Sequence, residues 1–269
     1  TLSPSSAASD VYKRQIQHCW SLGISRRLGF EAVSAGPSWR HISNAGHLDL
    51  SGGRLDELPQ LPESGFAHVQ HLDLNNLGMP LDVLDRFLGS FANVHVLNLS
   101  RNGLTSLPTV LRRLTRITDL DLTYNELTVT PSMQGLLDCL GELKKLSLQG
   151  NRVTALDVSA MTRLESLDLS HSAIKQWPAG VLQLPQLRQL NMSRSAITDI
   201  PAAGLQGHED LMSGTQLRGC RLTPESCARL LAYAQRTGRQ SAGDISPFLL
   251  ATGRTGGSPE FFPEEVSDN

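Results

Sequence analysis

The chain has 269 residues, of which 39% are hydrophobic, 19% are charged and only 5% are aromatic, so a folded core has to be mainly aliphatic. A formal net charge of −2 gives no electrostatic reason to expect binding to nucleic acid or to an anionic membrane surface. No apolar run approaches the roughly 18 residues that a membrane-spanning helix needs, so we expect no membrane span and a soluble protein.

The first 38 residues do not follow the pattern of the rest of the chain. Residues 1–15 are small and polar and resemble a joining segment more than native protein, so we leave them out of the fold. Residues 16–33 could form a partial cap, and we expect Trp39 and Ile42 to close the first structural unit. We therefore predict an irregular segment over 1–38, and we recognise no signal peptide in it.

From about residue 42 one pattern returns eight times. Aligned on the first leucine of a Leu-x-Leu triplet, the copies are LDLSGGRL (48–55), LDLNNLGM (72–79), LNLSRNGL (97–104), LDLTYNEL (120–127), LSLQGNRV (146–153), LDLSHSAI (167–174), LNMSRSAI (190–197) and the degenerate TQLRGCRL (215–222). Successive copies start 21–26 residues apart. This spacing and the pattern LxxLxLxxNxL resemble leucine-rich repeats.

The resemblance implies an α/β solenoid, or horseshoe, of about eight repeats. Side chains alternate along a strand, so each Leu-x-Leu places two leucines on one face, and stacked copies form a parallel sheet with a shared core. In four repeats a proline follows an apolar residue at the same position of the repeat: Pro59, Pro108, Pro178 and Pro201. Proline suits the start of a helical turn, so we predict short helices or 3₁₀ turns on the convex side. The turn position holds Asn102, Asn125 and Asn151, whereas Ser172, Ser195 and Cys220 replace it in later repeats.

The segment 223–238 predicts a helix that caps the solenoid. Thr223 suits the N-cap and Pro224 the first helical position. Four residues recur at the spacing of one helix face, and we predict that this face packs against the last repeat: Cys227, Leu230, Leu231 and Ala234. We thus place a repeat domain at 39–238, and the Gly-, Ser- and Pro-rich residues 239–269 read as a linker toward a further C-terminal domain.

Few cysteines are available for cross-linking. The four cysteines form no CxxC pair, and secreted disulfide scaffolds are denser in cysteine, so we expect a reducing environment. A disulfide between Cys220 and Cys227 stays an alternative.

Polar residues that flank the strand leucines are the candidates for partner binding. We expect them to form one continuous polar surface on the concave face, which is the usual binding surface of a solenoid. The position inside Leu-x-Leu contributes Asp49, Asp73, Asn98, Asp121, Asp168 and Asn191, and the position two residues after the triplet contributes Arg101, Tyr124, His171 and Arg194. Tyrosine and arginine are enriched at binding hot spots, so the second group supplies the expected anchors.

One cluster admits a different interpretation. His47 and Asp49 should lie beside His71 and Asp73 on adjacent strands, and two imidazoles with two carboxylates could hold a divalent metal. A polar patch in a wet groove is the interpretation that we prefer, so we predict no metal and no cofactor.

No catalytic motif is present in the sequence. It contains no Gly-rich phosphate loop, HExxH or GxSxG. Cys139 stands between apolar positions and is expected to pack as a small hydrophobic residue.

The segment WRHISNAGHLDLSGGRLDELPQLP (39–62), the LP-bearing repeats and RLLAYAQRTG (229–238) resemble the repeat region of secreted bacterial effectors that carry a novel E3 ubiquitin ligase (NEL) domain. The resemblance implies repeats that select host substrate proteins, secretion into host cytoplasm, and a ligase domain beyond residue 269. The family's nucleophile lies in a Cys-x-Asp motif, which none of the four cysteines here matches, so no catalytic residue is assigned.

Three functions are therefore weighed. The first is a protein-recognition module, the substrate-selecting part of such an effector. The second is a fragment of a cysteine-dependent ubiquitin ligase. The third is a structural or receptor-type scaffold without catalysis. The sequence names neither the partner nor the oligomeric state.

Overall fold

The structure, a computed structural model, describes residues 46–51, 66–67 and 69–237. Several expectations fall outside the described residues: those for the segment 1–38, for Trp39 and Ile42, for Pro59 and for the linker 239–269.

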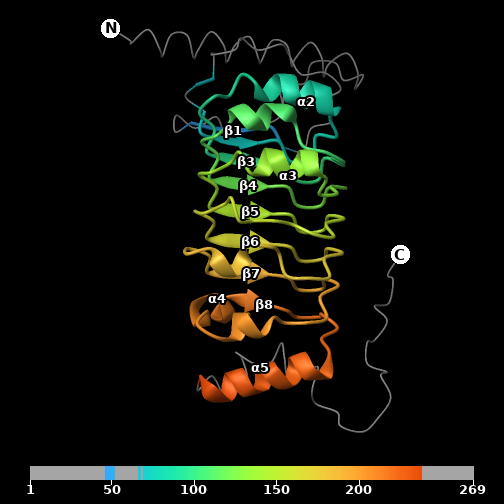
Figure 1. Cartoon of the computed structure of the whole chain (residues 1–269). Helices are drawn as coiled ribbons and strands as arrows, with labels where there is room; N and C mark the ends of the chain where they lie inside the picture. The colour runs from blue at the N-terminus through green and yellow to red at the C-terminus, as the bar shows by residue number, and fades with distance from the viewer. Residues whose placement is uncertain (1–45, 52–65, 68, 238–269) are drawn as a thin grey trace, which may run out of the picture.

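The repeats stack into one parallel sheet of eight strands in the order β1 to β8 (Figure 1). The strands are β1 (His47–Asp49), β2 (His71–Asp73), β3 (Val96–Asn98), β4 (Asp119–Asp121), β5 (Lys145–Ser147), β6 (Ser166–Asp168), β7 (Gln189–Asn191) and β8 (Thr215–Gln216). In β1 to β7 the first leucine of each triplet pairs with the same leucine of the next repeat, as in Leu97 with Leu120. The predicted leucine-rich-repeat solenoid is confirmed.

The core is a continuous column of aliphatic side chains behind the sheet. In the third repeat, Leu97 and Leu99 have no solvent exposure, and Leu104 and Leu107 are also buried. Because side chains alternate along a strand, both leucines of each triplet point into the core. The two later leucines, which follow the turn, pack in the same core. A single repeat could not bury these residues, so stability comes from neighbouring repeats.

Short helices and 3₁₀ turns form the convex layer, as predicted. They are α2 (Leu81–Leu88), η2 (Thr109–Arg113), α3 (Pro131–Leu137), η3 (Val181–Gln183), η4 (Ala202–Leu205) and α4 (Glu209–Ser213). Pro108 and Pro201 stand immediately before η2 and η4 with φ near −60°, a value that suits the start of a helical turn. These segments return the chain to the start of the next strand.

Asparagines at the turn position form a buried ladder between repeats. Asn125 Oδ1 accepts hydrogen bonds from the backbone N–H groups of Asn102 and Leu104, and its Nδ2 donates to the carbonyls of Leu99 and Leu122. In the later repeats Ser195 and Cys220 take this position, and Cys220 Sγ donates to the carbonyl of Met192 at 3.0 Å. The predicted role of asparagine in the turn is confirmed and extends across two repeats.

Helix α5 (Pro224–Arg236) covers the last repeat (Figure 1). Thr223 is the N-cap, and its hydroxyl accepts a hydrogen bond from Ser226 N. Cys227, Leu230 and Ala234 are buried as predicted, but Leu231 is 38% exposed, so its predicted position is wrong. The buried face includes Tyr233, which turns Leu231 away from the core.

The cysteines are not cross-linked in the described part of the chain. Cys139, Cys220 and Cys227 are free, so the alternative of a disulfide between Cys220 and Cys227 is not realised. Cys139 is partly buried, and its thiol donates to the carbonyl of Gly135.

Candidate functional site

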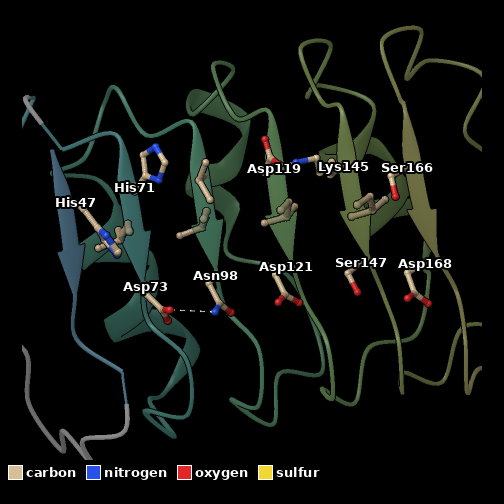
Figure 2. A pocket seen from close by; sticks show the side chains of 15 residues that line it. His47, His71, Asp73, Asn98, Asp119, Asp121, Lys145, Ser147, Ser166 and Asp168 are labelled. Atoms are coloured by element: carbon tan, nitrogen blue, oxygen red, sulfur yellow. Dashed lines mark hydrogen bonds and ion pairs between the residues drawn. The ribbon is translucent and has the colours of Figure 1, made fainter. Parts of the chain in front are cut away.

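Two rows of side chains cross the strands on the concave face of the sheet (Figure 2). The floor row is the residue inside each Leu-x-Leu triplet: Asp49, Asp73, Asn98, Asp121, Ser147, Asp168, Asn191 and Gln216. The outer row is the residue just before each triplet in β1 to β7: His47, His71, Val96, Asp119, Lys145, Ser166 and Gln189. The rows lie on one face because they are two residues apart in each strand.

Most of both rows lines a hollow of about 510 Å³ that runs from β1 to β6. Its lining includes Asp73, Asn98, Asp121 and Asp168 of the predicted site. Thus the structure brings Asp73 and Asp168, which lie 95 residues apart in sequence, onto one surface.

The acidic floor residues have a structural role in each repeat. Each Asp or Asn in this row accepts, through Oδ1, a hydrogen bond of 2.8–3.1 Å from the backbone N–H two residues later. The six residues are Asp49, Asp73, Asn98, Asp121, Asp168 and Asn191. Asp and Asn side chains are suited to this turn, which ends the strand. Only one side-chain oxygen is needed for it.

From β2 to β7 the floor row alternates between a carboxylate and a neutral side chain. Asn98 Nδ2 donates to Asp73 Oδ2 at 3.2 Å, and Asn191 Nδ2 donates to Asp168 Oδ2 at 3.0 Å. Neighbouring strands lie about 4.8 Å apart, so carboxylates on every strand would repel one another at close range. The alternation keeps charge on the floor while reducing this repulsion.

The groove carries an excess of negative charge. Among its charged residues on the described strands, Lys145 pairs with Asp119 at 3.0 Å, which offsets one carboxylate and, by that hydrogen bond, raises the pKa of Lys145. Among the described residues, the carboxylates of Asp121 and Asp168 form no salt bridge, and Asp73 has only the nearby charge of His47, which acts to lower its pKa. Burial raises the pKa of Asp73, and the neighbouring charge of Asp49 raises it further.

The four predicted anchors do not lie on the strands. Together with Asn76 they have φ of 53–57°, in the left-handed region: Arg101, Tyr124, His171 and Arg194. Gly150 and Gly219 take this position in two other repeats, also with positive φ. All four anchors are exposed. The prediction of one continuous sheet surface is therefore corrected, because the turn after each strand moves these residues to a separate row, which we call the rim.

Side chains of the rim lean over the next repeat. The guanidinium carbon of Arg101 lies 5.1 Å from the ring centre of Tyr124, in the range of a cation–π contact. A Cβ atom at Gly150 would lie 2.4 Å from the Tyr124 ring, so any other residue there would have to displace the ring. Tyr124 itself is 46% exposed. The rim therefore presents a supported aromatic ring beside an arginine.

The histidine and aspartate cluster lies where it was predicted. The rings of His47 and His71 are 5.9 Å apart on β1 and β2. Among the described residues, no group of three or more His, Cys, Asp or Glu side chains is arranged to hold a metal ion. The metal alternative thus gains no support from the geometry.

The comparisons agree with the repeat architecture. Residues 141–197 match the family model described as Leucine rich repeat. The chain contains leucine-rich repeats and has the fold of a leucine-rich-repeat solenoid. It is 23% identical to "Transforming growth factor beta activator LRRC33" of Danio rerio, in an alignment that covers 61% of this chain. It is 35% identical to "Podocan-like protein 1" of Homo sapiens, in an alignment that covers 49% of this chain. The alignments span 25% and 26% of those two proteins, so this leucine-rich repeat chain corresponds to about a quarter of their length.

Two solved leucine-rich repeat structures are also similar. An internalin C2 from Listeria monocytogenes is 21% identical with a TM-score of 0.47, covering 64% of this chain and 68% of its own. The leucine-rich repeat domain of APL1B is 20% identical with a TM-score of 0.49, and the alignment covers 69% of this chain and 61% of the APL1B chain. Within the described ranges, no helix of this leucine-rich repeat protein is long and apolar enough to cross a membrane.

Sequence reasoning missed part of the outer row. Val96, Asp119, Lys145 and Ser166 line the groove but were not among the predicted site residues. The signal was available, because a residue just before the first leucine has the same strand parity as the residue inside the triplet. The prediction instead followed the chain forward into the turn, where alternation ends.

Proposed function

We propose that this protein is a recognition module that binds a partner protein through the concave groove and the adjoining rim. The carrying observation is the exposed pair Arg101 and Tyr124, held at positive φ beside a groove of about 510 Å³. Non-glycine residues at positive φ cost backbone energy and are worth examining as functional positions. Here the backbone position accepts glycine in other repeats, so the large side chains are not needed for the turn.

The chemistry of the surface supports protein binding. Tyrosine provides a large contact area with few conformations to lose, and both tyrosine and arginine are enriched among residues whose truncation weakens complexes. The groove supplies polar and charged groups next to them, which favours a specific orientation of the partner. The site residues in this proposal are the floor residues Asp49, Asp73, Asn98, Asp121, Asp168 and Asn191 and the rim residues Arg101, Tyr124, His171 and Arg194.

Affinity capture from an extract of the source cells tests the proposal. The variant is R101G/Y124G, because glycine tolerates the positive φ that alanine would not. The control is R112A/R113A on the convex turn η2. We expect the rim variant to lose at least one captured protein that the control and wild type retain. Identical captured proteins for all three would contradict the proposal.

The narrower function predicted from motif resemblance is substrate selection in a secreted bacterial effector that carries a ubiquitin ligase domain. It rests on residues 39–62 and 229–238 and on the LP-bearing repeats. The parent coding sequence decides it: a downstream helical domain with Cys-x-Asp would support a ligase, and a stop codon shortly after Asn269 would remove it.

A further inference from the structure

The concave face of the sheet has a regular pattern of negative charge, and this pattern indicates which kind of protein segment could bind there. Asp73, Asp121 and Asp168 lie on β2, β4 and β6, with neutral floor residues between them. A separation of two strands is about 9.6 Å, and the full span of four strands is about 19 Å. The groove is thus marked by three carboxylates at regular intervals across the strands (Figure 2).

These carboxylates keep acceptor capacity toward the groove. A carboxylate has two oxygens with about four lone-pair sites. For Asp121, the hydrogen bonds within the described residues are from the backbone N–H and the hydroxyl of Thr123, and both go to Oδ1. The other oxygen, Oδ2, remains available to an incoming donor. Asp73 and Asp168 each receive one backbone N–H and one asparagine amide, which leaves lone pairs on both oxygens.

Backbone geometry limits which cationic segment can match this interval. In a polyproline II helix every third residue returns to the same side after a rise of about 9.3 Å. In a β-strand, residues on one side repeat every 6.6–6.8 Å or so. An α-helix returns to the same face after three or four residues, about 4.5–6 Å, and again after seven residues, about 10.5 Å. The polyproline II repeat is the closest match to two strand spacings, and over three cations its mismatch stays below about 1 Å.

We propose that the groove binds an extended, polyproline II segment of the partner protein that bears lysine or arginine at every third residue. The inference rests on the proposed function and adds the chemistry and conformation of the bound segment. Charge complementarity carries the choice of partner: the outer row offsets its own Asp119 with Lys145, whereas Asp121 and Asp168 on the floor form no salt bridge with a described residue. A polyproline II segment also loses little conformational entropy on binding.

Fluorescence anisotropy with two synthetic peptides tests the proposal. One labelled peptide is three Lys-Pro-Pro triplets, and the other has the same composition with its three lysines adjacent. The protein variants are D121N/D168N and the control D82N on the convex helix α2. Asparagine keeps the turn hydrogen bond, as Asn98 and Asn191 do in this row, so the double variant removes charge without removing the turn.

We expect the spaced peptide to bind wild type and D82N alike, and to bind D121N/D168N at least about tenfold more weakly, with affinity falling as salt is raised. We expect the grouped peptide to bind at least about threefold more weakly than the spaced one, since only one or two of its lysines reach carboxylates. No binding of the spaced peptide, equal binding to D121N/D168N, or equal binding of the two peptides overturns the inference. If one of these results is found, but R101G/Y124G still fails to capture a protein that wild type captures, then protein recognition stands and only binding of a cationic segment is rejected.

Discussion

Side-chain amides and carboxylates take different positions within one repeat. At the turn, an asparagine is buried because its amide can both accept from and donate to backbone groups of two repeats, as Asn125 does. Inside the triplet, either Asp or Asn suffices, because the turn uses a single oxygen. The charge of the residue inside the triplet is therefore free to vary with function, whereas the amide at the turn position is a structural requirement.

Changing Asn125 to alanine tests the structural requirement. The N–H groups of Asn102 and Leu104 would lose their partner in a buried site, while the two carbonyls keep bonds to Asn102 and Asn151. We expect the free energy of unfolding to fall by about 2–4 kcal/mol, measured by urea denaturation. The control N93A removes amide bonds at the surface and should cost less than about 0.5 kcal/mol. Equal losses would contradict the buried ladder.

Asp73 gives a pH dependence with a definite sign. Burial raises its pKa in the folded protein above the unfolded value, so the folded state holds this proton more tightly. Its contribution therefore favours the folded state at low pH and is lost as pH rises through the folded pKa. We expect D73N to gain stability relative to wild type as pH rises from about 3 to 6, measured as the difference between their urea midpoints. A difference that is constant or shrinks with pH would contradict this.

At the scale of elements, α5 closes the solenoid with a face that is rotated from the one its sequence predicted. Leu230 is 4% exposed and Leu231 is 38% exposed, although both fit a helical apolar stripe. The helix buries Ser226 and Tyr233 in addition to Cys227, Leu230 and Ala234, which fixes its rotation against the last repeat. Capping of the last repeat therefore depends on specific side chains and not on apolar content alone.

Alanine substitutions at the two adjacent leucines test that rotation. L230A should destabilise the protein by about 2–4 kcal/mol because it leaves a cavity under the cap. L231A should cost less than about 1 kcal/mol because its side chain is partly solvated already. Chemical denaturation of both variants provides the measurement. A larger loss for L231A than for L230A would refute the observed orientation of α5.

The sequence predicted the repeated elements well and the site geometry in part. The leucine triplets predicted each strand, because both leucines of a pair must reach one core. Strand alternation also predicted the direction of Asp73 and Asp121. It failed at Arg101 and Tyr124, because the backbone enters the left-handed region there and period-two reasoning no longer applies. Rotation of α5 was not predictable either, since it depends on packing against a surface distant in sequence.

At the scale of the whole molecule, the described repeats form a stack, and no other described element covers the concave face of its sheet. Convex helices and turns, the aliphatic core and the sheet form successive layers, and α5 covers the end at the eighth strand (Figure 1). Residues of β1 to β6 meet in one groove, although each strand has only three residues. A long segment can thus touch several repeats at once, so affinity can come from many small contacts along the stack.

Carboxylate footprinting tests the central claim, which is recognition through the concave face. The protein alone and in complex with a captured partner would be labelled with a carbodiimide and an amine, and the modified residues quantified by mass spectrometry. We predict that binding lowers labelling of Asp121 and Asp168 in the groove and leaves the exposed Asp82 and Asp138 of the convex layer unchanged. Protection of Asp82 and Asp138 with unchanged labelling of Asp121 and Asp168 would contradict the account.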